Sequence, residues 1–115
     1  MKVRVYQING RRAPFAMYMG YSRMNGSIDP ENYDIVFEGE LKNRRTLEGA
    51  FRHFNDNKNP RPRGMHSLSG SDVVELIEPC GKTPAGFCFC DSIGFRRIDF
   101  DASLTVRRNN CVVGY

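Results

Sequence analysis

The sequence predicts an α+β domain, with a mainly antiparallel sheet of about five strands and two short helices packed on one face. Several segments are rich in β-branched and aromatic residues, and one segment has helical periodicity. The predicted helices come early and three strands follow one another late, an order typical of α+β folds. With 115 residues, the chain is expected to form a single domain over residues 1–115.

The first strand is predicted over residues 3–8, because it is rich in β-branched and aromatic residues and ends at Asn9-Gly10. Residues 14–24 begin with Pro14, which suits a first helical turn, but they also contain Gly20. A short helix or an irregular segment is expected there. Its methionines are interpreted as core residues.

A half-buried strand is predicted over residues 33–41 from its alternation. One face would carry the apolar side chains of Tyr33, Ile35, Phe37 and Leu41. The other face would carry the solvated acids Asp34, Glu38 and Glu40.

The amphipathic helix is predicted over residues 47–54. Its apolar residues follow the i, i+3, i+4, i+7 pattern, with Leu47, Ala50, Phe51 and Phe54 on one stripe. Thr46 is expected to be the N-cap. Residues 55–64 are predicted to be a loop, because Asn, Asp and two Pro-Arg pairs disfavour helix and strand.

Three further strands are predicted over residues 72–78, 86–91 and 95–100. The first of them is nearly all apolar, which favours a central position in the sheet. Residues 101–115 are predicted to form a final hairpin, with a partly mobile tail as the alternative.

The charge is uneven along the chain. The net charge is +4, and 13 of the 17 basic residues are arginine. Residues 29–41 carry five acids and no base, whereas residues 42–63 carry seven basic groups and two acids. A concentrated basic stretch indicates a phosphate-binding or acid-binding surface and argues against mimicry of DNA.

No cofactor, membrane segment or small-molecule substrate is predicted. The four cysteines, Cys80, Cys88, Cys90 and Cys111, contain no C-x-x-C pair and are expected to be free thiols. No apolar run approaches the ~18 residues of a membrane span, and the N-terminus has no signal-peptide pattern. A cytoplasmic location is expected.

Four blocks of the sequence resemble the YodL-like domain family, in the family's order. They are NYDIVFEGEL (32–41), LEGAFRHFN (47–55), GMHSLSGSDVVEL (64–76) and FCFCDSIGFRRIDF (87–100). The resemblance covers about residues 32–100. It implies a small accessory protein of a bacterial plasmid, phage or integrative element, a setting that includes anti-CRISPR and anti-restriction factors. It brings no catalytic residues with it.

Two turns carry the most specific parts of this resemblance. The short polar side chains of Ser67, Ser69 and Asp72 are expected to bond nearby backbone and fix a tight turn into the next strand. Gly94 is expected to have a positive φ, with Asp91 capping the same turn.

Three functions are compared. The preferred one is a non-enzymatic inhibitor that binds a bacterial defence nuclease or its guide RNA. The alternatives are a direct RNA-binding module and a metal-free ribonuclease that uses His53 and His66 as general base and acid. The predicted partner-binding residues are Arg44, Arg45, Arg52, Lys58, Arg61, Arg63, His66, Arg96 and Arg97.

Overall fold

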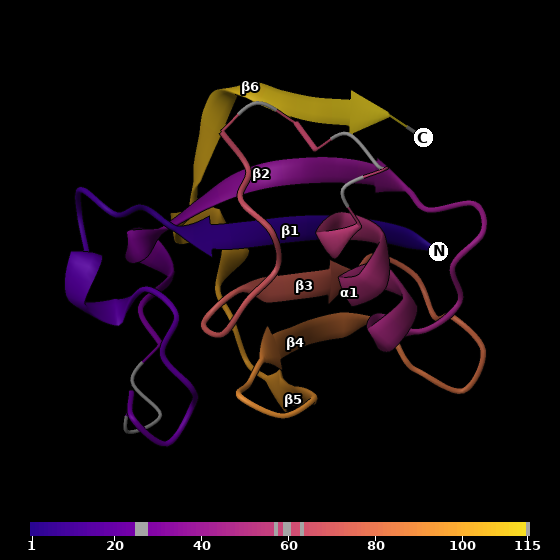
Figure 1. Ribbon diagram of the computed structural model, residues 1–115, viewed down its shortest axis with the longest axis horizontal. Helices are drawn as coiled ribbons and strands as arrows, with labels where there is room; N and C mark the ends of the chain where they lie inside the picture. Colours follow the sequence, from indigo (N-terminus) through magenta and orange to yellow (C-terminus); the bar gives the residue numbers. More distant parts are fainter. Residues whose placement is uncertain (25–27, 57, 59–60, 63, 115) are drawn as a thin grey trace.

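The computed structural model has a six-stranded mixed sheet with one α-helix in front of it (Figure 1). The structure describes residues 1–24, 28–56, 58, 61–62 and 64–114, and side chains up to residue 107. The strands are β1 (Lys2–Ile8), β2 (Tyr33–Glu40), β3 (Val73–Leu76), β4 (Gly86–Cys90), β5 (Phe95–Ile98) and β6 (Val106–Gly114). The helix α1 spans Leu47–Asn55, and three 3₁₀ turns span Pro14–Ala16, Pro30–Asn32 and Ala102–Leu104.

The strand order is β5-β4-β3-β1-β2-β6, and every pair is antiparallel except β2 with β6. The α+β class and the central position of β3 are therefore confirmed. The predicted C-terminal hairpin is wrong, because residues 106–114 form one strand beside β2. The sheet thus has six strands with a parallel pair, where about five antiparallel strands were expected.

The second predicted helix is also absent from the described residues. Pro14 opens only a 3₁₀ turn, because Met17 is extended and Tyr18 has a φ of +65°. In contrast, α1 follows its prediction closely. The Oγ1 of Thr46 accepts a hydrogen bond from the Gly49 N–H at 2.9 Å, so Thr46 is the N-cap.

Two apolar clusters cover the two faces of the sheet. Val3, Val5, Val74 and Leu76 pack under α1, together with Met65 and Leu68 from the segment that leads into β3. On the other face, Tyr6, Ile8, Tyr33, Val73 and Phe89 pack against Phe100 and the 13–28 segment. Both faces are therefore buried, and the helices do not share one face as predicted.

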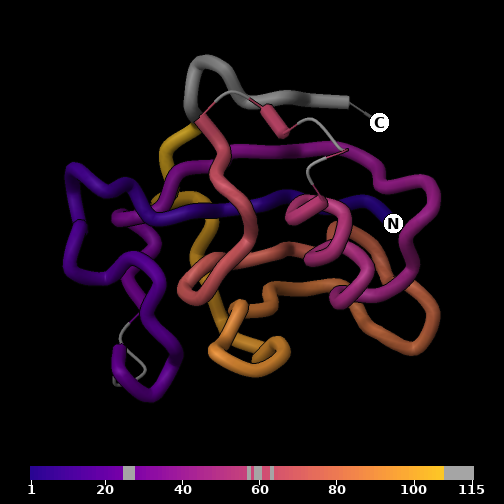
Figure 2. The backbone as a smooth tube through the Cα atoms, in the orientation of Figure 1, coloured from indigo at the N-terminus to yellow at the C-terminus, as the bar shows by residue number. Residues whose placement is uncertain are grey.

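The chain crosses the second face between β5 and β6 (Figure 2). The Phe100 ring lies 5.2 Å from the rings of Tyr6 and Tyr33 and 5.4 Å from that of Phe87, measured between centroids. This aromatic cluster holds the crossing segment against the sheet. The strand β6 consequently joins the edge opposite β5.

A β-bulge in β2 overturns the prediction of a solvated acidic face. Val5 faces Phe37 while Tyr6 faces Ile35, so Val36 has no partner on β1. The extra residue sends Asp34 and Glu38 to opposite faces of the sheet. Both carboxylates are buried, with 2% and 6% of their surface exposed.

Each of these carboxylates is paired with arginine. Asp34 accepts hydrogen bonds from Arg12 at 2.7 Å and from Asn9 at 2.9 Å. Glu38 accepts from Arg4 at 2.7 Å and from Arg107 at 2.8 Å. Buried charges need such partners, so these three arginines are part of the fold.

Arg4 extends this network to β3. Its guanidinium also contacts Glu75, which in turn accepts a hydrogen bond from the Tyr6 hydroxyl at 2.6 Å. Burial opposes the charged form of Arg4, but the hydrogen bond to Glu38 and the charge of Glu75 raise its pKa. The chain Arg107–Glu38–Arg4–Glu75 thereby connects β6, β2, β1 and β3.

No helix among the described residues is long and apolar enough to cross a membrane. Cys80, Cys88 and Cys90 are free thiols, as predicted, and the side chain of Cys111 lies outside the described residues.

Candidate partner-binding surface

Three cations lie together in the loop between β2 and α1. Lys42 and Arg45 are exposed and Arg44 is half-buried. The three line one hollow of about 440 Å³, together with Thr46 and Gly49 at the start of α1. We call Lys42, Arg44 and Arg45 the basic surface. None of the three makes an ion pair with another described residue.

Hydrogen bonds to the backbone hold this loop in place. The Met1 nitrogen donates to Leu41 O at 3.0 Å, and the Arg44 N–H donates to Leu41 O at 3.3 Å. The Cys80 thiol donates to Arg45 O at 3.3 Å, which ties the loop to the β3–β4 connection. The backbone of the basic surface is therefore positioned before any partner binds.

A second hollow, of about 630 Å³, lies beside the first and shares Lys42 and Arg44 with it. Its other walls include the Phe37 and His53 rings. Burial and the nearby charge of Arg44 lower the pKa of His53. The imidazole is therefore neutral at pH 7. The hollow combines two cations and the acid Glu40 with aromatic walls.

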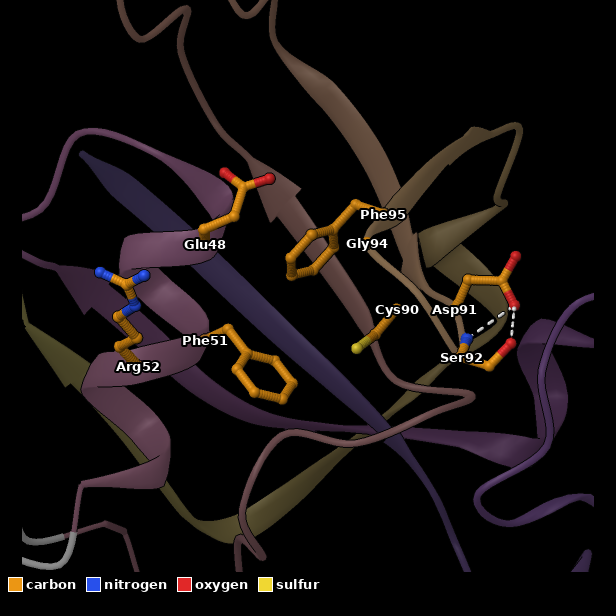
Figure 3. A pocket seen from close by; sticks show the side chains of 8 residues that line it. All are labelled: Glu48, Phe51, Arg52, Cys90, Asp91, Ser92, Gly94 and Phe95. Atoms are coloured by element: carbon orange, nitrogen blue, oxygen red, sulfur yellow. Dashed lines mark hydrogen bonds between the residues drawn. The ribbon is translucent and has the colours of Figure 1, made fainter.

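Arg52 belongs to another hollow, between α1 and the β4–β5 hairpin (Figure 3). This pocket of about 260 Å³ is lined by Arg52 and Glu48 on one side and by Phe51 and Phe95 within it. The Cys90 thiol also borders it, but burial raises the pKa of that thiol to about 12, so it is a poor nucleophile. Arg52 thus lines a different hollow from that of the basic surface.

Arg61 has a structural contact. Its guanidinium donates to Phe54 O at 2.8 Å, which satisfies a carbonyl at the C-terminal end of α1. Lys58 is exposed in the turn that follows, where its N–H donates to Asp56 Oδ1 at 2.9 Å. Arg63 lies outside the described residues.

Arg96 and Arg97 on β5 also contact the protein itself. The Arg96 guanidinium lies 3.9 Å above the Tyr21 ring in a cation–π contact. Arg97 donates to Pro84 O at 2.7 Å and to Ala85 O at 3.1 Å. Both side chains are exposed, yet they also fasten loops to the edge of the sheet.

His66 lies at the start of the turn into β3. Its N–H donates to Gln7 Oε1 at 3.1 Å, and Gln7 Nε2 donates to His66 O at 2.9 Å and to Asp72 Oδ2 at 3.1 Å. The His66 ring lies 5.5 Å from the Tyr18 ring, between centroids. His53 has a different environment, against Phe54 and the Leu41–Arg44 hollow, and these contacts give no support to a joint catalytic role.

The turn matches the expectation for Asp72 but not for Ser69, because the buried Ser69 Oγ has no hydrogen-bond partner among the described residues. Asp72 Oδ2 accepts from the Ser69 N–H at 2.9 Å, and the Asp72 N–H donates to Ser69 O at 3.2 Å. Burial raises the pKa of Asp72 well above its usual range. Ser67 is exposed, and no side-chain hydrogen bond is described for it.

The hairpin turn at residues 91–94 is also as expected. Gly94 has a φ of +71°, and Asp91 Oδ1 accepts from the Ser92 N–H at 2.8 Å. The same oxygen accepts from the Tyr21 N–H at 3.0 Å, and the two backbone hydrogen bonds lower the pKa of Asp91. This aspartate therefore also anchors the N-terminal segment.

Sequence reasoning missed Lys42, Phe15 and Tyr18. Lys42 was part of the basic stretch but was not singled out, although it is adjacent to the turn that ends β2. Phe15 and Tyr18 lie in the same segment as Met17 and Met24, which pack against the core, and the exposure of the two rings was not predicted. Their sequence signal is the neighbouring Pro14 and Gly20, which prevent a continuous helix.

The described residues contain no cluster of three or more His, Cys, Asp or Glu side chains that could hold a metal ion. The geometry therefore defines a small α+β domain with a preformed cationic surface. A family model, the YodL-like domain, matches residues 2–100, and the chain belongs to that family. The match extends to β1 and the N-terminal segment, beyond the motifs found at 32–100. Searches of curated proteins and of solved structures found no match.

Proposed function

We propose that this protein is a non-enzymatic, cytoplasmic inhibitor from a bacterial mobile element or phage. It would act in counter-defence, of the anti-CRISPR or anti-restriction type, by docking on the RNA of a bacterial defence nuclease complex through the basic surface. The family gives the setting for this proposal, and the arrangement of cations gives the contact.

The observation that carries the proposal is how the fold uses its arginines. Arg4, Arg12 and Arg107 are paired with buried acids, and Arg61, Arg96 and Arg97 contact backbone carbonyls or an aromatic ring. The basic surface has no such partner among the described residues. Its three positive charges are therefore available to an external anion.

Phosphate chains fit this surface well. Two of its three cations are arginines, whose guanidinium groups bind phosphate oxygens in a bidentate way. The adjacent hollow offers the aromatic walls of Phe37 and His53, against which a base can pack. The exposed acids Glu40 and Glu48 flank the loop. A polyanionic partner must therefore make direct contacts with the arginines, because the net charge of this region alone would attract it only weakly.

The test is capture from a lysate of a bacterium that carries a CRISPR or restriction system. Tagged wild-type protein is compared with Arg45→Glu and with Lys58→Glu, which has the same charge change on an exposed residue after the C-terminal end of α1. We expect wild type and Lys58→Glu to recover a nuclease complex with its RNA, and Arg45→Glu to lose it.

Ribonuclease treatment of the lysate separates the two kinds of contact. Loss of the nuclease after treatment supports docking on RNA. Recovery that survives treatment shows a contact with the protein subunit instead. Equal recovery by wild type and Arg45→Glu contradicts the proposed surface.

A further inference from the structure

Phe15 and Tyr18 are exposed aromatic residues in one short loop. Their side chains are 72% and 59% exposed, whereas most other aromatic side chains pack in the two core clusters. They are three residues apart, so their Cα atoms are separated by at most about 11 Å. The proposed function makes no use of them.

The fold holds Tyr18 in a conformation that costs free energy. Its φ is +65°, in the left-handed region that residues with a Cβ atom avoid. Its N–H donates to Ser71 Oγ at 3.0 Å, and Ser71 itself has a φ of +76°. Strain of this kind is found preferentially where a side chain is positioned for function.

A rigid support lies behind the Tyr18 ring. The His66 ring is 5.5 Å away, tilted by 56°, and His66 is held by Gln7 through its backbone N–H and C=O. Gln7 is fixed in turn by Asp72, which is buried. The Tyr18 carbonyl also packs on Gly70, where a Cβ atom would lie only 2.9 Å from that oxygen.

The segment that carries these aromatic rings is basic in sequence. Residues 9–24 include Arg11, Arg12 and Arg23 and no acid. Arg12 is paired with Asp34, but Arg11 is exposed and makes no ion pair with a described residue. Exposed aromatic rings and exposed arginine in one segment are a combination by which proteins bind single-stranded nucleic acid, since bases stack on rings and phosphates contact cations.

We infer that Phe15, Tyr18 and Arg11 form a second contact site, for an unpaired segment of RNA, with a base stacked on Tyr18. This inference rests on the proposed function, because it selects a single-stranded region of the same RNA partner. Positive charge and stacking surface occur together here, which favours RNA over an apolar protein segment.

Fluorescence provides a direct test. The chain has no tryptophan, so Tyr18→Trp introduces a single indole at the proposed stacking position. We expect a single-stranded RNA of about 12 nucleotides, a length within the range that single-strand binding domains cover, to quench this fluorescence. A duplex of the same sequence should not quench it. Quenching by neither RNA overturns the inference.

Affinity measurements by fluorescence anisotropy use a matched pair of variants. Tyr18→Asn removes the ring but keeps a residue that tolerates positive φ. Ile93→Asn makes the same replacement at an exposed apolar residue in the β4–β5 turn. We expect Tyr18→Asn to weaken binding of the single strand about tenfold, as for loss of one stacked base, and Ile93→Asn to leave it unchanged. Thermal unfolding checks that both variants fold.

Arg45→Glu separates this inference from the proposed function. If Arg45→Glu weakens binding of the single strand and Tyr18→Asn does not, the basic surface stands and the second site is overturned. If only Tyr18→Asn weakens binding, the second site stands without the basic surface. A wild-type protein that binds no single-stranded RNA overturns the second site, and lysate capture then decides the proposed function.

Discussion

The N–H of Tyr18 donates a hydrogen bond to the Ser71 hydroxyl at 3.0 Å, across 53 residues of chain. These two residues are also the non-glycine residues with positive φ in the described part of the chain. The bond therefore joins two strained positions, one in the N-terminal loop and one in the turn into β3. It ties the backbone of an exposed aromatic residue to the turn that leads into β3.

Replacement of Ser71 separates the hydrogen bond from the strain. Ser71→Ala loses the bond to Tyr18 and should lower the free energy of unfolding by about 1 kcal/mol. Ser71→Gly loses the same bond but relieves the positive φ, a gain of about 1 kcal/mol over alanine. Urea denaturation of both variants checks this order. If Ser71→Gly is no more stable than Ser71→Ala, the positive φ of residue 71 does not strain the backbone.

Gly70 is expected to tolerate no side chain. Gly70→Ala places a Cβ atom 2.9 Å from the Tyr18 carbonyl oxygen, so backbone must move. We expect a loss of about 2 kcal/mol, as for other overpacked sites. Gly10→Ala is the control, because its Cβ would meet the flexible Met17 thioether at 2.8 Å. Thermal denaturation should show a clear loss for Gly70→Ala only.

Asp72 makes stability depend on pH. Its pKa in the folded protein is raised above the unfolded value of about 3.9, so the folded state binds the proton more tightly. This contribution is therefore fully present below pH ~4 and is lost as pH rises through the folded pKa. Asp72→Asn keeps one acceptor oxygen and cannot titrate.

The comparison is made by urea denaturation at several pH values. We expect the stability of wild type, relative to Asp72→Asn, to fall as the pH is raised above about 4. If the free energy of unfolding has the same pH dependence in both proteins from acid to neutral pH, then the pKa of Asp72 is not raised in the folded protein.

Glu38 is expected to stabilise the attachment of the edge strand β6 to the sheet. Glu38→Gln replaces two charge-assisted hydrogen bonds, from Arg4 on β1 and Arg107 on β6, with weaker neutral ones. We expect a loss of about 2 kcal/mol in denaturation experiments. Glu40→Gln, on an exposed residue of the same strand, is the control and should change little.

The sequence was most informative where local signals agree. Thr46 and the apolar stripe from Leu47 to Phe54 predict α1 and its cap, because both depend on neighbouring residues. The turn residues Gly94 and Asp91 were predicted for the same reason. Such features need no knowledge of distant strands.

The remaining features depend on long-range pairing. The bulge at Val36 arises from the register between β1 and β2, so the burial of Asp34 and Glu38 was invisible in the alternation. The parallel pairing of β6 requires the chain to cross one face of the sheet after β5, where Phe100 packs against Tyr6. Among the predicted site residues, Arg44 and Arg45 lie together, while Arg61, Arg96 and Arg97 contact backbone carbonyls or Tyr21 that only the fold brings near.

The contact of Arg61 also changes which variant tests function. Arg61→Glu removes a hydrogen bond from the end of α1, so lost activity would not separate folding from binding. Lys42 and Arg45 are exposed, and their side chains make no hydrogen bond or ion pair with a described residue. We therefore expect substitutions there to leave the fold intact and to change only the surface.

The central claim is that the basic surface binds RNA phosphates, and the salt dependence of RNA affinity tests it most directly. Each phosphate contact to a single strand contributes about −0.7 to the slope of log K against log salt concentration. We predict that Lys42→Ala with Arg45→Ala weakens RNA binding and makes the slope shallower by about 1.4. An unchanged slope and affinity in this double variant would contradict the account.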